Sequence, residues 1–314
     1  MIAIGIDIGG TSIKGAGITK EGKVLDVFSM PVDKADTQEE TINKLIDAVN
    51  KYIKDQGFKK EKILGIGCGV PGVMDTKTGI VTYSNNLRWF DLPIVEMLEK
   101  GTGLKVRITN DANAAALGEA RFGAGKKYKN IIMITLGTGV GGGIVIDGKL
   151  FEGNLGKGAE LGHSVLVMDG EQCSCGRKGC FEAYASATAL IRDTKRAMEQ
   201  HKESKCWEVA EKLGKVDARV AFEAERLGDE TGHQLVENYV KYLGEGLLNY
   251  FNIFRPEALI LSGGIANEGE YLLSRLRKYF ELYNYGFQGT PKVDLLVSEL
   301  GYDSGKIGAA ALFF

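Results

Sequence analysis

The sequence has no surplus of positive charge and no long apolar run. Its 39 Lys and Arg residues and 41 Asp and Glu residues give a formal net charge of −2 over 314 residues. Proteins that bind a nucleic-acid backbone or an anionic membrane need a basic surface, so neither is an expected partner. The longest segment without charge, residues 130–146, is shorter than the ~20 residues of a membrane-spanning helix and is rich in glycine. We therefore expect no membrane span.

Proline, cysteine and histidine are scarce, with five, five and three residues. So few prolines exclude a collagen-like chain or a proline-rich linker. The cysteine count is odd and three cysteines crowd into residues 173–180, which argues against a disulfide framework. The first residues also lack the basic segment that opens a signal peptide. These absences predict a cytoplasmic protein in a reducing environment.

Hydrophobic spacing predicts an α/β protein. Apolar residues alternate over residues 2–8, follow helical spacing over 37–56 and form a continuous strand over 63–70. Strands that alternate with helices are typical of the α/β class, whose sites lie at strand ends. At ~150 residues per domain the chain is long enough for two lobes. Residues 186–243 are charged and helix-periodic, which predicts a helical cover on the second lobe.

Glycine is abundant, with 43 residues, about twice its usual share of roughly 7%. A strand, a glycine turn and a second strand occur at residues 4–18 and again at 131–146. Two similar halves would face each other across a cleft, although a repeat this short also arises by chance. Both interpretations stay open at this point.

The first glycine turn carries the residues expected around a bound polyphosphate. Adjacent glycines let backbone N–H groups approach an anion, and neighbouring hydroxyls and a lysine add donors and positive charge. A carboxylate just before the turn makes sense if Mg²⁺ lies between it and the phosphates. An ordinary hairpin turn would contain the same glycines. The candidate residues are Asp7, Gly9, Gly10, Thr11, Ser12 and Lys14.

A second glycine turn at residues 137–143 contains five glycines. Each costs about 0.5 to 1 kcal/mol of conformational entropy relative to alanine, so we expect a bulky ligand to approach the backbone there. The spacing matches neither the P-loop nor the dinucleotide-binding motif. Two such turns on two lobes predict a nucleotide whose phosphates are held from both sides, with a third turn at its adenosine end. The candidates are Gly137, Thr138 and Gly139 in the second turn and Gly263 and Gly264 in the third.

Asp111 follows the predicted strand at residues 106–109 and opens an alanine-rich helix. One interpretation is a helix N-cap, whose side-chain oxygen accepts hydrogen bonds from the first turn. The other is the general base that accepts the proton of an alcohol in phosphoryl transfer, a reaction that otherwise depends on positioning and charge neutralisation. The residues alone leave both interpretations open.

Four residues have the composition of a closed zinc site. One imidazole and three thiolates form a Cys₃His set, which zinc adopts in tetrahedral structural sites with no position left for a catalytic water. A loop stiffened by the metal can hold the flanking carboxylates of Glu160 and Glu182 toward the hydroxyls of a polyol. These two carboxylates also fit plain surface charge. The predicted ligands are His163, Cys173, Cys175 and Cys180.

Seven motifs together resemble the ROK family of bacterial sugar kinases and sugar-responsive repressors. The resemblance spans essentially the whole chain, and its most specific motif is the glycine-bracketed Cys-x-Cys-Gly-x-x-Gly-Cys-x-Glu. It implies an actin-like, ribonuclease H-like α/β fold of two lobes, residues 1–118 with 303–314 and residues 119–302, with ATP and sugar in the cleft. The motifs are residues 7–11, 69–72, 110–116, 136–143, 160–163, 173–182 and 262–264.

The same resemblance implies roles for single residues. Asp111 would be the catalytic base, and His163 would bind sugar as well as zinc. Residues 85–89 are similar to a segment of the family's glucokinases, which implies that Asn86 lies at the sugar. The sugar-binding residues implied are Gly72, Asn86, Asn110, Asp111, Glu160, His163 and Glu182.

These expectations lead to an ATP-dependent hexose kinase, specifically a glucokinase of glycolysis that uses Mg²⁺ with ATP and holds structural Zn²⁺. The resemblance also implies a homodimer or higher homo-oligomer. Family repressors carry a helix-turn-helix before the first glycine turn, and because that turn begins at Gly9 we expect no DNA-reading domain. The open alternatives are a kinase for N-acetylmannosamine, N-acetylglucosamine, allose or fructose, polyphosphate as the donor, and a sugar sensor without turnover. A zinc module for nucleic acid conflicts with the net charge.

Overall fold

The computed structural model describes residues 1–283 and 292–314. It forms two compact units, one of residues 1–133, 143–159 and 299–314, the other of residues 134–142 and 160–298. This division differs from the expected lobe boundaries after residue 118 and before residue 303. The reason is that residues 143–159 return to the first unit, where the Thr109 hydroxyl donates to the Glu152 carboxylate at 2.5 Å. The lobe boundaries themselves stay a prediction.

The first unit is built on a five-stranded sheet with strand order β3-β2-β1-β4-β8. β1, β2 and β3 are antiparallel neighbours, whereas β4 and β8 run parallel to β1. A small antiparallel sheet of three strands, β5, β6 and β7, follows β4. The strands are β1 (Ile2–Ile8), β2 (Ser12–Thr19), β3 (Val24–Pro31), β4 (Ile63–Val70), β5 (Val73–Asp75), β6 (Ile80–Ser84), β7 (Trp89–Leu92) and β8 (Val106–Asn110).

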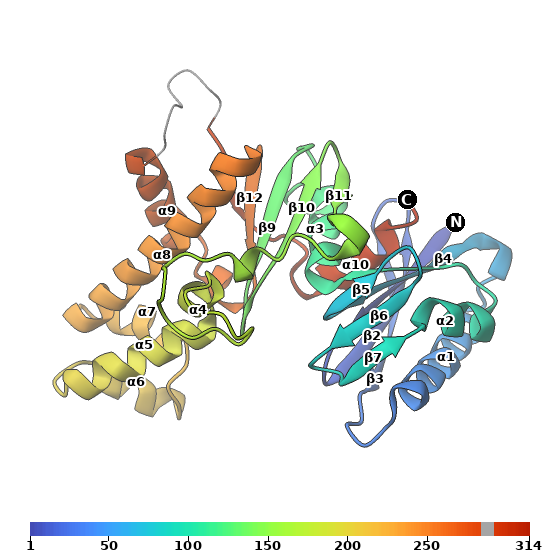
Figure 1. Ribbon diagram of the computed structural model, residues 1–314, viewed down its shortest axis with the longest axis horizontal. Coiled ribbons are helices and arrows are strands. Elements are labelled where there is room, and N and C mark those ends of the chain that lie inside the picture. The colour runs from blue at the N-terminus through green and yellow to red at the C-terminus, as the bar shows by residue number, and fades with distance from the viewer. Residues whose placement is uncertain (284–291) are drawn as a thin grey trace. The chain divides into compact units, whose positions relative to one another are not determined.

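The two faces of this sheet bury different residue types. On one face the isoleucines of β1 pack with α1 (Gln38–Asp55) and α2 (Ile94–Thr102) in a large apolar core. On the other face the strands carry glycine and alanine, and α3 (Asp111–Phe122) and α10 (Ser304–Ala311) lie there (Figure 1). A Cβ atom on Gly5 of β1 or Gly67 of β4 would collide with the α10 backbone. The absent side chains therefore let α10 lie directly on the sheet.

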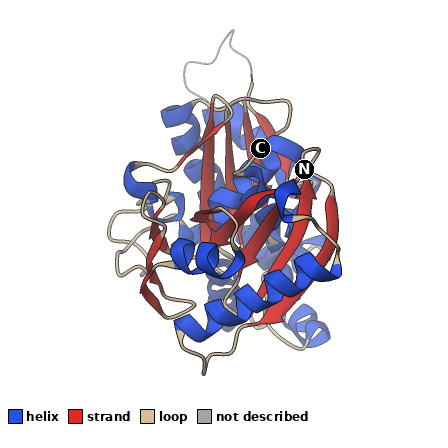
Figure 2. Cartoon of the chain, turned by 90° about the vertical axis from the view of Figure 1, so that its right-hand side faces the viewer, coloured by secondary structure: helices blue, strands red, loops and turns tan. Residues whose placement is uncertain are grey.

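The second five-stranded sheet repeats the strand order of the first. Its order is β11-β10-β9-β12-β13. In both sheets the first strand in chain order stands in the middle. The second and third strands lie on one side of it, and the fourth and fifth lie on the other. Helices flank the strands of both sheets (Figure 2). The repeated order favours two similar halves over chance repetition. The strands are β9 (Ile131–Leu136), β10 (Val140–Ile146), β11 (Lys149–Phe151), β12 (Ala258–Ser262) and β13 (Asp294–Val297).

Helices make up most of the second unit, and the helices predicted within residues 186–243 are confirmed. Single-turn 3-10 helices lie at residues 60–62, 154–156, 161–163, 264–268 and 301–303. Among the described residues, no helix is both long and apolar enough to cross a membrane. The helices of this unit are α4 (Glu182–Ala185), α5 (Ala187–Gln200), α6 (Cys206–Leu213), α7 (Arg219–Arg226), α8 (Glu230–Phe254) and α9 (Glu270–Tyr283).

Candidate active site

Three neighbouring strand ends gather candidate residues of the first unit. β1, β4 and β8 are parallel, so their carboxyl ends meet at one edge of the sheet. Asp7 stands opposite Gly69, and Asn110 ends β8 beside the same strand. The Asn110 amide donates a hydrogen bond to the Gly72 carbonyl at 3.3 Å. Two of the predicted sugar-binding residues therefore touch each other.

Asn110, rather than Asp111, is the N-cap of α3. Its side-chain oxygen accepts the N–H of Ala112 at 2.9 Å and that of Asn113 at 3.4 Å. Asp111 is the first residue of the helix, and its carboxylate accepts a hydrogen bond from the Ala112 N–H at 2.9 Å. The interpretation of Asp111 as N-cap is wrong, because the neighbouring amide already does that work. Burial raises the pKa of the Asp111 carboxyl, against several hydrogen bonds that lower it.

Asp7, the residue before the last of β1, lies on the sheet face that α10 covers. Burial raises the pKa of its carboxyl, and the charge of Asp111 raises it further, whereas Lys306 and Lys14 lower it. A Cβ atom on Gly305 would lie 3.0 to 3.2 Å from the Asp7 carboxylate atoms, so α10 begins directly against this group. Two partly buried carboxylates that repel each other are stabilised by a cation. This donor set fits the expected Mg²⁺, which prefers oxygen ligands.

The first glycine turn joins β1 to β2. The Gly9 N–H closes it by donating to the Ser12 carbonyl at 3.0 Å, and Lys14 pairs opposite Asp7 in the two strands. Asn86, from the loop between β6 and β7, lies against this turn, because a Cβ atom on Gly10 would be 3.6 Å from its Cβ. The turn is a hairpin turn, and its role in phosphate binding stays a prediction.

The second glycine turn is held by the residues that follow the cysteine cluster. The Glu182 carboxylate accepts the N–H of Val140 at 3.0 Å, and a Cβ atom on Gly139 would collide with it. At the start of α5, the Ala187 N–H donates to the Gly137 carbonyl at 2.9 Å. Glu182 is therefore bonded to the turn and is not a plain surface charge.

The third glycine turn lies beside the second. Gly263 follows β12 with a φ of +90°, which favours glycine. A Cβ atom there would overlap the backbone of Leu136, the last residue of β9. The two turns are therefore neighbours in the second unit.

The four predicted zinc ligands form one cluster. Their ligand atoms all lie within 4.8 Å of one another, with 3.7 Å between the Cys175 and Cys180 sulfurs and 3.7 Å between Cys173 Sγ and His163 Nδ1. Zn–S bonds of ~2.3 Å in a tetrahedron place sulfurs about 3.8 Å apart, so the cluster fits zinc. Burial and the neighbouring thiols raise the pKa of Cys180 to about 12, so a bound cation is what would hold these thiolates together.

Comparison with known proteins agrees with this geometry. The model of the ROK family matches residues 3–314. The chain belongs to the ROK family. This ROK protein is 36% identical over 314 residues to the glucokinase of Halalkalibacterium halodurans, covering 98% of this chain and 94% of that one. It is 32% identical to the xylose repressor of Bacillus subtilis, covering 99% of this chain and 76% of the repressor.

A solved structure extends the similarity to three dimensions. The ROK family glucokinase from Streptomyces griseus, in complex with glucose and AMPPNP, is similar to the ROK protein with a TM-score of 0.81 and 36% identity. The similarity covers 99% of each chain. The expected actin-like fold of ROK sugar kinases is confirmed.

The candidate residues of the ROK protein fall into one group in each unit, and their roles stay predictions. In the second unit, Glu160 precedes His163, whose N–H donates to the Glu160 carbonyl at 3.1 Å. The first unit holds Asp7, Gly9, Gly10, Thr11, Ser12, Lys14, Gly72, Asn86, Asn110 and Asp111; the second holds Gly137, Thr138, Gly139, Glu160, His163, Cys173, Cys175, Cys180, Glu182, Gly263 and Gly264.

Sequence reasoning missed several polar residues beside these groups. The Ser174 hydroxyl donates to the Glu182 carboxylate at 2.8 Å, and the Thr188 hydroxyl donates to the Thr138 carbonyl at 2.7 Å. In the first unit, Asn113 Oδ1 and Ser84 Oγ are buried without a hydrogen-bond partner within the described part of the chain. Ser174 stands between two ligands and could have been noticed there; the others belong to no short motif that names their partner.

Proposed function

We propose that this ROK protein is a glucokinase, which transfers the γ-phosphoryl group of ATP to the 6-hydroxyl of D-glucose. The observation that carries the proposal is the state of Asp111, a partly buried carboxylate that directly follows a strand, beside the residue that caps the helix. A general base works best when its pKa lies nearer to the operating pH than an ordinary aspartate does. Burial shifts Asp111 in that direction. The similarity to glucokinases at about 36% identity supports glucose as the substrate.

In the proposed reaction, Asp111 accepts the proton of the 6-hydroxyl while the hydroxyl oxygen attacks the γ-phosphorus. The bond between that phosphorus and the bridging oxygen of ADP breaks, which leaves ADP and glucose 6-phosphate. Backbone N–H groups of the glycine turns bind the phosphates. When bound beside Asp7, Mg²⁺ supplies charge neutralisation. The proposed sugar-binding residues are Gly72, Asn86, Asn110, Asp111, Glu160, His163 and Glu182.

The proposal is tested by ADP release from Mg-ATP with glucose, mannose, fructose, allose, N-acetylglucosamine and N-acetylmannosamine. We expect the highest kcat/KM with glucose. A higher value with an amino sugar would keep the chemistry and replace the substrate. The same panel with polyphosphate in place of ATP identifies the donor, and light scattering on purified protein tests the proposed homodimer.

A sugar sensor without turnover is the second candidate, favoured by the similarity to a xylose repressor. It predicts that sugar binds while no ADP is released with any of the six sugars. Turnover that disappears in the Asp111→Asn variant would exclude it, because a contaminating kinase would not respond to this substitution.

A further inference from the structure

One short segment, residues 182–192, contacts both the cysteine cluster and the second glycine turn. It comprises α4 and the first part of α5. Three of its residues form hydrogen bonds to the turn. The Glu182 carboxylate accepts the Val140 N–H at 3.0 Å. The Ala187 N–H donates to the Gly137 carbonyl at 2.9 Å, and the Thr188 hydroxyl donates to the Thr138 carbonyl at 2.7 Å. All of these residues lie in the second unit. The position of the turn therefore depends on this segment.

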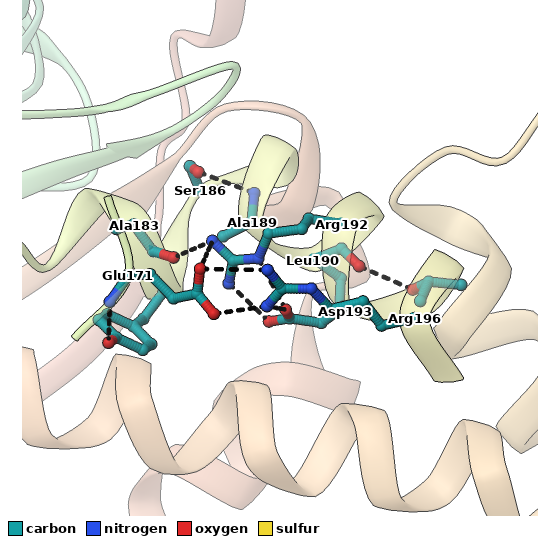
Figure 3. A network of polar contacts seen from close by, with 10 residues as sticks. Glu171, Ala183, Ser186, Ala189, Leu190, Arg192, Asp193 and Arg196 are labelled. Carbon is teal, nitrogen blue, oxygen red and sulfur yellow. Dashed lines mark hydrogen bonds and ion pairs between the residues drawn. The ribbon is translucent and has the colours of Figure 1, made fainter. Parts of the chain in front are cut away.

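The same segment holds the loop that carries the cysteines. Arg192 and Arg196 of α5 both face the carboxylate of Glu171, which precedes the first cysteine (Figure 3). Arg192 also donates to the Ala183 carbonyl of α4 at 2.9 Å, whereas Arg196 makes no such bond to α4 within the described residues. The Glu171 N–H donates to the Tyr184 hydroxyl at 2.8 Å. Arg192 thus ties the loop to α4.

The carboxylate of Glu182 connects the cysteine loop to the second glycine turn, because each of its oxygens bonds to one of them. Its Oε1 atom accepts the Ser174 hydroxyl at 2.8 Å, and Ser174 lies between two cysteines of the cluster. Its Oε2 atom accepts the Val140 N–H of the turn. A carboxylate with each oxygen bonded to a different segment cannot rotate without breaking one of the bonds. A change in the cysteine loop is therefore transmitted to the turn.

We propose that residues 182–192 couple the metal site to the glycine turn, so that zinc occupancy sets the affinity for the phosphates of the nucleotide. The inference rests on the proposed function, in which this turn binds ATP. Without zinc, the four ligand side chains are no longer held together by a common metal ion, and the loop loosens. Ser174 and Glu171 then release Glu182 and Arg192, and the turn loses its fixed shape. Coupled sites typically change each other's affinity by about 5- to 150-fold.

The first experiment measures the dissociation constant for ADP by calorimetry in the absence of sugar. Zinc-loaded protein is compared with protein treated with a chelator that prefers zinc to magnesium, and with the same protein after zinc is returned. We expect binding to weaken about tenfold on zinc removal and to recover with zinc. An unchanged dissociation constant in folded, zinc-free protein would overturn the coupling. If zinc-loaded protein bound no nucleotide, the proposed function would fail instead.

Because zinc removal can also unfold the loop, two variants test the coupling with the metal in place. Thr188→Val keeps the side-chain shape and removes the donor to Thr138, while Thr188→Ser keeps the donor. We expect ADP binding to weaken about fivefold in the valine variant and to be normal in the serine variant. Zinc content and glucose affinity should be the same in both. Normal ADP binding by the valine variant would contradict the role of α5 in holding the turn.

Arg192→Met and Arg196→Met form a matched pair one helical turn apart. Both lose a contact to Glu171, but only the first loses the bond to α4. We expect ADP binding to weaken in Arg192→Met and to stay within twofold of the unchanged protein in Arg196→Met, with zinc bound in both. Equal ADP affinities in the two variants would exclude this route between the metal and the turn.

Discussion

At the scale of single residues, the properties of the Asp111 carboxylate depend on Asn110 and on burial. Asn110 accepts the N–H groups of the first helical turn, so the carboxylate of Asp111 is not the cap of the helix. The buried position then raises its pKa, because water no longer stabilises the charge. A carboxylate in this state suits proton transfer better than an exposed one. It also makes the ionised side chain unfavourable for folding.

Replacing Asp111 by asparagine should therefore lower activity and raise stability. Loss of a general base typically costs 10²- to 10⁴-fold in rate, and we expect kcat to fall within that range. A carboxyl whose pKa is raised on folding contributes stability below its unfolded pKa and loses that contribution as pH rises through the folded pKa. At pH 7 the ionised group is thus a cost, which asparagine removes. Calorimetry should show a higher Tm for Asp111→Asn.

Asp75→Asn is the control, because we expect it to change stability in the direction opposite to Asp111→Asn. Hydrogen bonds from the Lys77 and Thr78 N–H groups lower the pKa of Asp75, so its ionised form stabilises the fold at pH 7. Asp75→Asn should leave kcat unchanged and lower Tm slightly. Equal changes of Tm in the two variants would contradict this account of Asp111.

The pH dependence of catalysis follows from the same carboxyl. If Asp111 is the base, as proposed, it must be ionised to accept the proton, so kcat/KM should decline as pH falls through its pKa. Since that pKa is raised, the decline should begin above the value of ~3.9 that is usual for aspartate. A pH profile of kcat/KM at constant ionic strength measures it. A profile that stays flat down to pH 4 would show that Asp111 is not the base.

At the scale of elements, the alternation of isoleucine and glycine in β1 and β4 decides where the helices lie. The isoleucines pack with α1 and α2, and Gly5 and Gly67 face α10. This arrangement brings the start of α10 against Asp7 and packs the helix on α3, which begins with Asp111. The close packing of α10 on Gly5 and Gly67 thus places the start of this helix beside Asp7.

Gly67→Ala should destabilise the protein strongly because its Cβ would collide with the backbone carbonyl of Ala309. Overpacking of a core typically costs about 1 to 3 kcal/mol, and a backbone neighbour leaves little room to relax. Urea unfolding measures the change. Gly17→Ala in β2 is the control, because its Cβ would meet only side-chain atoms, 3.2 Å away or more. Similar losses in the two variants would contradict the close contact of α10 with the sheet.

At the scale of the whole molecule, a metal ion bound by the cysteine cluster would cross-link a loop of the second unit that has little regular secondary structure. Within the described residues, the loop from residue 164 to residue 181 contains only short turns and isolated bridges. All five cysteines are free thiols. A structural zinc ion contributes folding free energy directly, since its ligands come together only in the folded chain.

Zinc removal should therefore lower both stability and sugar binding. We expect about one zinc ion per chain in freshly purified protein, a lower Tm after chelation and a weaker affinity for glucose, because His163 and Glu182 belong to or flank the cluster. Elemental analysis, calorimetry and glucose titration measure the three effects. Less than about half an equivalent of zinc per chain would contradict the assignment of the ligand set.

Much of this protein was determined by its sequence alone. Helical periodicity located α1 between Thr37 and Gln56, and a capping box of Thr37 and Glu40 fixes where it begins. The family and the fold followed from short motifs, and so did the four clustered residues that are the predicted zinc ligands. Such features depend on residues close together in the chain, so a local pattern is enough to specify them.

Tertiary structure alone decided how the candidate residues are supported. Asn110 caps α3 while its amide also reaches Gly72, and the pKa of Asp7 is raised by burial beneath α10 and by the charge of Asp111. Thr188 meets the second glycine turn some fifty positions back along the chain. These contacts join residues far apart in sequence, and their energies depend on burial and exact approach. Burial and approach distances are defined only once the chain has packed, so no local sequence pattern specifies them.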